Sequence, residues 1–85
     1  MYSIVITEYA IRQLKKINKQ MVASIKEAIA ELAQNPRPHN HIKLTNVEAY
    51  RVRVGNYRII YEINDNVLIV TVVEIADRKQ AYKKK

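Results

Sequence analysis

Three arginines lie close together in the second half of the chain, and their spacing indicates a phosphate-binding surface. Arg51 and Arg53 alternate with apolar residues over positions 50–54, a pattern typical of a β-strand with two unlike faces. The pair Gly55-Asn56 then predicts a two-residue turn. In such a hairpin Arg53 faces Arg58, and both share a sheet face with Arg51. Because opposed like charges destabilise a sheet by roughly 0.2–1 kcal/mol, this arrangement favours an anion between them.

The same arginines also fit a simpler interpretation, a solvated strand face without function. Glu62 falls on that face and is able to neutralise one of the three charges. The cluster also depends on the register, since a shift of one residue would move the arginines to the other face. The pattern alone leaves both interpretations open.

The opposite face of this hairpin is apolar and aromatic, so other elements must cover it. Residues 8–17 and 19–34 have helical spacing with one apolar stripe and predict a helical hairpin. Apolar runs at 4–6 and 67–73 predict two more strands, the second central because both its faces are apolar. Residues 36–46, with both prolines, predict a loop. The predicted fold is therefore α+β, in the order β-α-α-β-β-β, a small, mainly antiparallel sheet with the helical hairpin packed on one face.

Length and composition restrict the class of protein. The 85 residues suffice for one core, which predicts a single domain over 1–85. The absence of cysteine rules out disulfides and thiolate metal sites and favours a cytoplasmic location, and no apolar run approaches the length of a membrane span. The net charge of +7 favours a polyanionic partner such as nucleic acid, a ribosomal surface or an acidic protein.

The hairpin over 50–63, followed by an apolar strand and then by Arg78 and Tyr82, resembles the RelE branch of the RelE/ParE toxin superfamily. The resemblance covers nearly the whole chain, including the opening strand, the helical hairpin and Asn35-Pro36. It implies a toxin of a type II toxin–antitoxin pair, an endoribonuclease that cleaves mRNA in the ribosomal A site without a metal or other cofactor. It also implies an acidic, RelB-like antitoxin as partner, besides the ribosome and mRNA.

The resemblance further implies roles for individual residues. The 2′-hydroxyl of the RNA attacks the adjacent phosphate, and the guanidinium groups of Arg53, Arg58 and Arg78 suit the negative charge that then develops. Tyr82 either stacks on a base or takes the 2′-hydroxyl proton. Further cations would hold the RNA: Arg51, Lys79, Lys15, Lys16 and Lys19.

Two positions depart from the pattern of the family. Relatives often have lysine where this chain has Arg51 and Arg53, and arginine does not act as a base, so proton removal falls to Tyr82 or Lys79. Relatives commonly have histidine or lysine just before the C-terminal arginine, where this chain has Asp77. That carboxylate would orient the arginine, act as a base, or repel phosphate.

Other candidate sites are weaker. His39 and His41 form an H-x-H pair, but no third ligand lies close in sequence, so we interpret them as loop residues and expect no metal site. Two alternatives to the nuclease remain: a ParE-like inhibitor of DNA gyrase without nuclease chemistry, and a basic nucleic-acid-binding module with a degenerate site. The joint presence of the three catalytic arginines and Tyr82 favours the nuclease.

Overall fold

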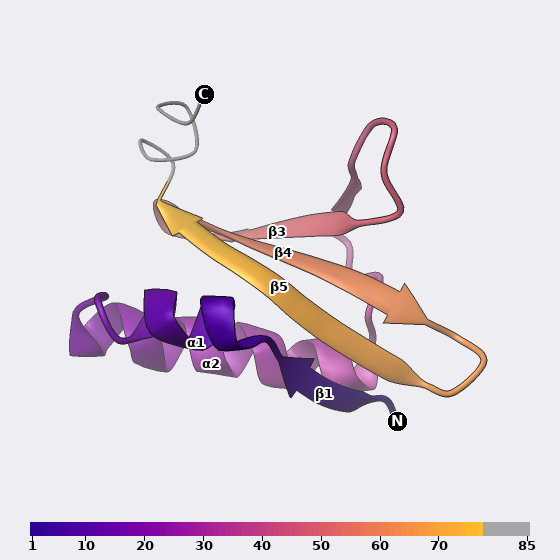
Figure 1. The fold of residues 1–85 in the computed structure, drawn as a ribbon, viewed down its shortest axis with the longest axis horizontal. Helices are drawn as coiled ribbons and strands as arrows, with labels where there is room; N and C mark the ends of the chain where they lie inside the picture. The colour runs from indigo at the N-terminus through magenta and orange to yellow at the C-terminus, as the bar shows by residue number, and fades with distance from the viewer. Residues whose placement is uncertain (78–85) are drawn as a thin grey trace.

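The computed structural model describes residues 1–77, and the candidate residues Arg78, Lys79 and Tyr82 lie outside this range. The structure is a five-stranded sheet with two helices beneath it, which confirms the α+β fold (Figure 1). The strands lie in the order β1-β5-β4-β3-β2. The elements along the chain are β1 (Ser3–Ile6), α1 (Glu8–Leu14), α2 (Lys19–Gln34), β2 (Ile42–Lys43), β3 (Tyr50–Val54), β4 (Tyr57–Asn64) and β5 (Ile69–Asp77).

Side-chain caps determine where both helices begin. The Oγ1 of Thr7 accepts the backbone N–H of Ala10 at 3.2 Å, and the Oδ1 of Asn18 accepts that of Met21 at 2.9 Å. Helix α1 ends at Leu14 rather than at residue 17 as predicted. The chain there tightens into i→i−3 hydrogen bonds and turns directly into the cap of α2.

The β3–β4 hairpin has the predicted register. Residues 50–54 pair with 57–61 across a two-residue turn, and Gly55 has φ of 59°, as the first central residue of a type II′ turn requires. A side chain at Gly55 would also be crowded, because a Cβ there would lie 3.0 Å from the Cε of Met21 in α2. This contact places the hairpin turn beside the start of α2.

The remaining strands differ in part from the prediction. Strand β5 lies between β1, to which it is parallel, and β4, which confirms its internal position. It spans Ile69–Asp77 rather than residues 67–73, because Val67 and Leu68 belong to the exposed turn before it. The predicted loop over 36–46 contains the two-residue strand β2, which pairs with the first residues of β3.

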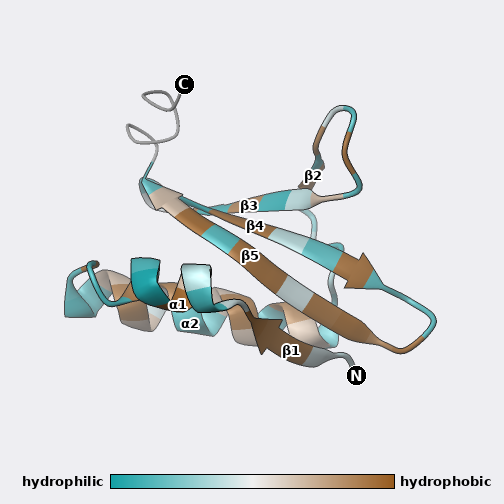
Figure 2. Ribbon diagram, in the orientation of Figure 1, coloured by the Kyte–Doolittle hydropathy of each residue, from teal (hydrophilic) through white to brown (hydrophobic). Residues whose placement is uncertain are grey.

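The core lies between the helices and the lower face of the sheet, where apolar segments of α2, β4 and β5 meet (Figure 2). Tyr61 is fully buried in it, and its hydroxyl donates to the carbonyl oxygen of Pro36 at 2.7 Å. Burial raises the pKa of Tyr61 to about 12. The fully buried aliphatic partners of Tyr61 are Ile25, Leu32, Ile59, Val70, Val72 and Ile75.

Candidate nucleic-acid interface

Arg51, Arg53 and Arg58, here called the arginine face, lie on the side of the sheet opposite the helices. Their neighbours in sequence, Val52 and Ile59, are buried against the helices, so alternation directs the arginines the other way. Arg53 and Arg58 are direct cross-strand partners, as the sequence predicted. Two guanidinium groups are therefore carried by adjacent, rigid strands.

The arginine side chains are held to different degrees. Arg53 is exposed, whereas Arg51 and Arg58 are half-buried and their Nε atoms are shielded from solvent. Arg58 lies opposite the small residue Ala76, and Arg51 lies between Ile42 and Ile60 on the neighbouring strands. These apolar residues are the cross-strand neighbours of the arginines, and they lower the local dielectric, which strengthens attraction to a phosphate.

Two carboxylates share this side of the sheet. Glu74 lies opposite Ile60 and is half-buried, and Glu62 lies opposite Thr71 and is exposed. A β-bulge between Ile60 and Tyr61 adds one residue to β5. From the hairpin turn toward the other end of the sheet, the order of charges is thus arginine pair, Glu74, Glu62.

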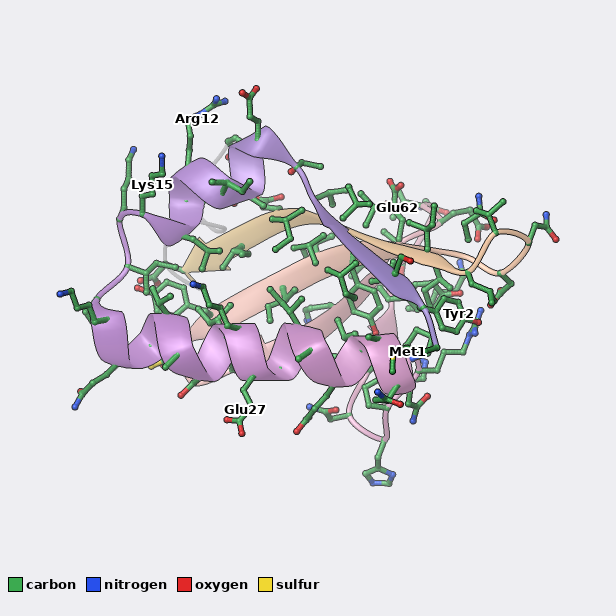
Figure 3. The ribbon with its side chains drawn as sticks, turned by 90° about the horizontal axis from the view of Figure 1, so that it is seen from below. Met1, Tyr2, Arg12, Lys15, Glu27 and Glu62 are labelled. Atoms are coloured by element: carbon green, nitrogen blue, oxygen red, sulfur yellow. The ribbon has the colours of Figure 1, made fainter. Side chains whose placement is uncertain are left out.

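The three predicted lysines gather at the hairpin end of the protein. Lys15 is the C-cap of α1, Lys16 follows it, and Lys19 begins α2; all three are exposed. Arg12 and Lys15 project away from the body of the protein (Figure 3). Because Met21 lies against Gly55, this helical turn is close to the turn that joins the strands of the arginine face.

Asp77 lies on the other side of the sheet from Arg58. It pairs with Tyr57, whereas Arg58 pairs with Ala76, and it lines a cleft between α1 and the end of β5. The cleft has a volume of about 270 Å³. Its location makes Asp77 a poor candidate for a base at the arginine face. This cleft was not predicted from the sequence, although the i, i+3, i+4, i+7 spacing of one helical face is present at Tyr9, Arg12, Gln13 and Lys16.

A second cluster that the sequence analysis missed closes the opposite end of the protein. Arg37 contacts Asp65 with both terminal nitrogens, at 2.9 and 3.3 Å, and the hydroxyl of Tyr2 donates to the same carboxylate at 2.6 Å. The hydrogen bond from Arg37, followed by that from Tyr2, lowers the pKa of Asp65, and the bond to Asp65 raises the pKa of Tyr2. We call Tyr2, Arg37 and Asp65 the terminal cluster.

The two histidines of the H-x-H pair have different surroundings. The Nδ1 of His41 is 2.6 Å from the carbonyl oxygen of Pro38, a distance at which the ring donates to the backbone, and His39 is exposed. Within residues 1–77 no three side chains of His, Asp or Glu are grouped in a way that could hold a metal ion. Over the same range neither helix has the length and hydropathy needed to cross a bilayer.

Comparison with known proteins shows which family this chain matches. Residues 4–82 match the family model of the ParE toxin of the type II toxin–antitoxin system parDE. A Methanocaldococcus jannaschii protein named "Putative toxin RelE1" is 28% identical over an alignment of 86 positions, gaps included, which covers 96% of each chain.

Solved structures of similar proteins share the fold. A chain of the RelBE2 toxin–antitoxin complex from Mycobacterium tuberculosis is 25% identical, with a TM-score of 0.82 over 91% of this chain and 98% of that one. A chain of the archaeal RelE–RelB complex from Pyrococcus horikoshii gives the same identity and TM-score over 91% and 94%. The resemblance to RelE/ParE toxins predicted from the sequence is confirmed.

Proposed function

This chain belongs to the ParE toxin family of type II toxin–antitoxin systems, and from this we propose that it is a ribosome-dependent, metal-independent endoribonuclease that cleaves mRNA in the cytoplasm. The observation that carries the proposal is the pairing of Arg53 with Arg58 on the sheet face opposite the helices. Two cations fixed in this way suit a phosphate whose negative charge increases during reaction.

The reaction follows from the chemistry of RNA. The 2′-hydroxyl oxygen attacks the adjacent phosphorus, and the bond from phosphorus to the 5′-oxygen of the next nucleotide breaks. The products are a 2′,3′-cyclic phosphate and a 5′-hydroxyl. Arg53 and Arg58 donate hydrogen bonds to the non-bridging oxygens, and Arg51 binds a neighbouring phosphate. Lys15, Lys16 and Lys19 extend the contact toward ribosomal RNA.

The C-terminal residues complete the proposed site. Arg78 adds a third guanidinium, Lys79 binds the RNA backbone, and Tyr82 stacks on a base or removes the 2′-hydroxyl proton. The family match supports this assignment because it extends to residue 82 and so includes these positions. Arg51 and Arg53 do not act as the base, since arginine stays protonated.

We propose a RelB-like antitoxin as the partner. Support comes from the similar toxins of M. tuberculosis and P. horikoshii, whose structures are those of toxin–antitoxin complexes. An acidic segment of the antitoxin is expected to bind over the arginine face and so exclude RNA.

A second candidate is inhibition of DNA gyrase, which the ParE name of the matching family favours. This function needs a protein-binding surface but no cations placed for phosphate chemistry. The two candidates therefore differ in whether substitution of the phosphate-binding residues abolishes toxicity.

The test is induction of the toxin in growing cells, with mapping of transcript 5′ ends. Wild type is expected to stop growth and to produce new 5′-hydroxyl ends inside translated codons. Arg78→Ala and Tyr82→Ala are each expected to abolish both effects without lowering the melting temperature, whereas Lys26→Ala, an exposed change on α2, keeps them. Growth arrest without new RNA ends, together with loss of DNA supercoiling, would reject the nuclease in favour of the gyrase inhibitor.

A further inference from the structure

The cleft between α1 and the end of β5 combines aromatic rings with cations, and its place in the fold suggests a ligand. Tyr9 is 49% exposed and Tyr57 is half-buried, so two aromatic side chains contribute to its walls. Arg12 lies one turn after Tyr9 on α1, Lys16 lies in the turn that follows this helix, and both line the cleft with Tyr9. Aromatic surface beside positive charge is the pattern that binds single-stranded nucleic acid.

The cleft is a structured feature rather than a gap between mobile side chains. The Oε1 of Gln13 accepts the backbone N–H of Ile75 at 2.6 Å, which fixes α1 against β5 at the base of the cleft. Its volume of about 270 Å³ is close to the lower end of small-molecule pockets, about 300 Å³. A single nucleotide matches this size.

The cleft is also next to the arginine face along the chain. Tyr57 and Arg58 are consecutive residues of β4, so their side chains leave opposite sides of the sheet near its end. A strand of RNA several nucleotides long that passes around this end can contact Arg58 with one phosphate and enter the cleft with a nucleotide farther along the strand. The cations Arg12, on α1, and Lys16, in the turn after it, then continue the positive path.

We propose that this cleft binds one nucleotide of the same single-stranded RNA whose scissile phosphate lies at the arginine face, with the base on Tyr9 and the phosphate at Arg12 and Lys16. This inference rests on the proposed function, because it takes RNA as the substrate. Asp77 lines the cleft as well, and its carboxylate repels an acidic peptide and also a phosphate placed beside it, so the proposal puts the phosphate at Arg12 and Lys16 and the base toward Asp77. A carboxylate accepts hydrogen bonds from the amino group of a base such as cytosine and repels another carboxylate.

The experiment measures binding separately from cleavage. The full-length protein is titrated into a fluorescent hexanucleotide RNA that carries 2′-O-methyl groups throughout and therefore lacks the attacking hydroxyl. Tyr9→Leu is expected to weaken binding at least fivefold, since stacking of one base contributes that much or more, while Tyr9→Phe stays within twofold. Melting temperatures of both variants check that the fold is intact.

Charge variants test the phosphate contact. Arg12→Gln and Lys16→Gln are each expected to reduce the slope of log affinity against log salt by about 0.7, the value for one lost contact with single-stranded nucleic acid. Lys26→Gln removes one exposed charge from α2 outside the cleft and is expected to leave the slope unchanged. Equal effects of Lys16→Gln and Lys26→Gln, or full binding by Tyr9→Leu, would overturn the inference.

Two further outcomes distinguish this inference from the proposed function. Binding that depends on Tyr9 in a protein that cleaves no RNA on ribosomes would support the cleft and reject the nuclease. A peptide of ten glutamates tests a protein ligand by its effect on the backbone amide NMR signals of Tyr9, Gln13 and Ile75. If the peptide shifts these signals and the RNA does not, the cleft binds an acidic protein segment and the inference is wrong.

Discussion

At the scale of single residues, the direct pairing of Arg53 with Arg58 relates stability to function. Two like charges at this spacing destabilise the isolated protein, whereas a bound phosphate compensates for them. We expect Arg53→Glu to abolish RNA cleavage and to raise the free energy of unfolding by roughly 0.2–1 kcal/mol, because repulsion becomes attraction. Denaturant unfolding and a cleavage assay on the same preparation check the two effects.

Arg53→Gln is the control for this substitution. It removes the repulsion without adding an attraction, so its stability is expected to lie between wild type and Arg53→Glu. A glutamate variant less stable than the glutamine variant would show that the Arg58 guanidinium does not interact with residue 53 across the strands.

Tyr61 carries a polar hydroxyl group but lies in the hydrophobic core. Its hydroxyl is the donor to the Pro36 carbonyl, and the side chain is fully buried. Tyr61→Phe is expected to lower the free energy of unfolding by about 1–3 kcal/mol, since the buried carbonyl loses its donor. Because the pKa in the folded protein, about 12, exceeds the ordinary value of about 10, wild type also loses stability as pH rises from 10 toward 12, and the Phe variant does not lose this contribution.

At the scale of elements, the sequence correctly predicted the helices and strands whose ends are determined by residues at or next to those ends. Helix α2 has the predicted bounds because Asn18 caps it and Asn35-Pro36 ends it, and the β3–β4 register follows from Gly55 in its turn. Helix α1 is shorter than predicted because apolar spacing continues into a turn. Strand β2 was missed because two residues carry no detectable alternation, and it forms only through pairing with β3.

The terminal cluster joins three connections that are distant in sequence. Tyr2 precedes β1, Arg37 follows α2, and Asp65 lies between β4 and β5, so one carboxylate links these segments. The lowered pKa of Asp65 means that its contribution to stability is present above pH 4 and is lost as pH falls through the folded pKa. Asp65→Asn is therefore expected to melt below wild type at pH 6, with the difference shrinking between pH 4 and pH 2.

Glu62→Gln provides the control for the pH series, because Glu62 is an exposed carboxylate outside the terminal cluster. Its melting temperature is expected to follow wild type at every pH. A constant difference between Asp65→Asn and wild type down to pH 2 would mean that the ionised carboxylate contributes nothing through Arg37 and Tyr2.

At the scale of the whole molecule, the sequence predicted the part of the candidate site that depends on residues close together in the chain. It did not predict the part that depends on tertiary packing. The arginine face required only one hairpin and its register, and both were readable from alternation. The cleft at α1 was not predictable, because it depends on how the helices dock against β5 through Gln13 and Ile75. Asp77 lies on the other side of the sheet from Arg58 because it pairs with Tyr57, and the alternation of a strand separates the faces of residues 57 and 58.

The net charge of +7 and its distribution lead to the last prediction, which concerns association with the antitoxin. Cations of α1, of the α1–α2 turn and of the arginine face lie toward one end of the protein, so an acidic segment is attracted there before it docks. We expect the association rate to fall about tenfold between low and 0.5 M salt, because the Debye length falls from about 30 Å at 0.01 M to well below 10 Å. Stopped-flow mixing of the two proteins measures this rate.

Arg53→Glu should reduce both the rate and its salt dependence, and Lys26→Gln should change them little. Direct competition at the arginine face would be excluded if the antitoxin bound equally fast at all salt concentrations and if the toxin, when saturated with antitoxin, still bound RNA.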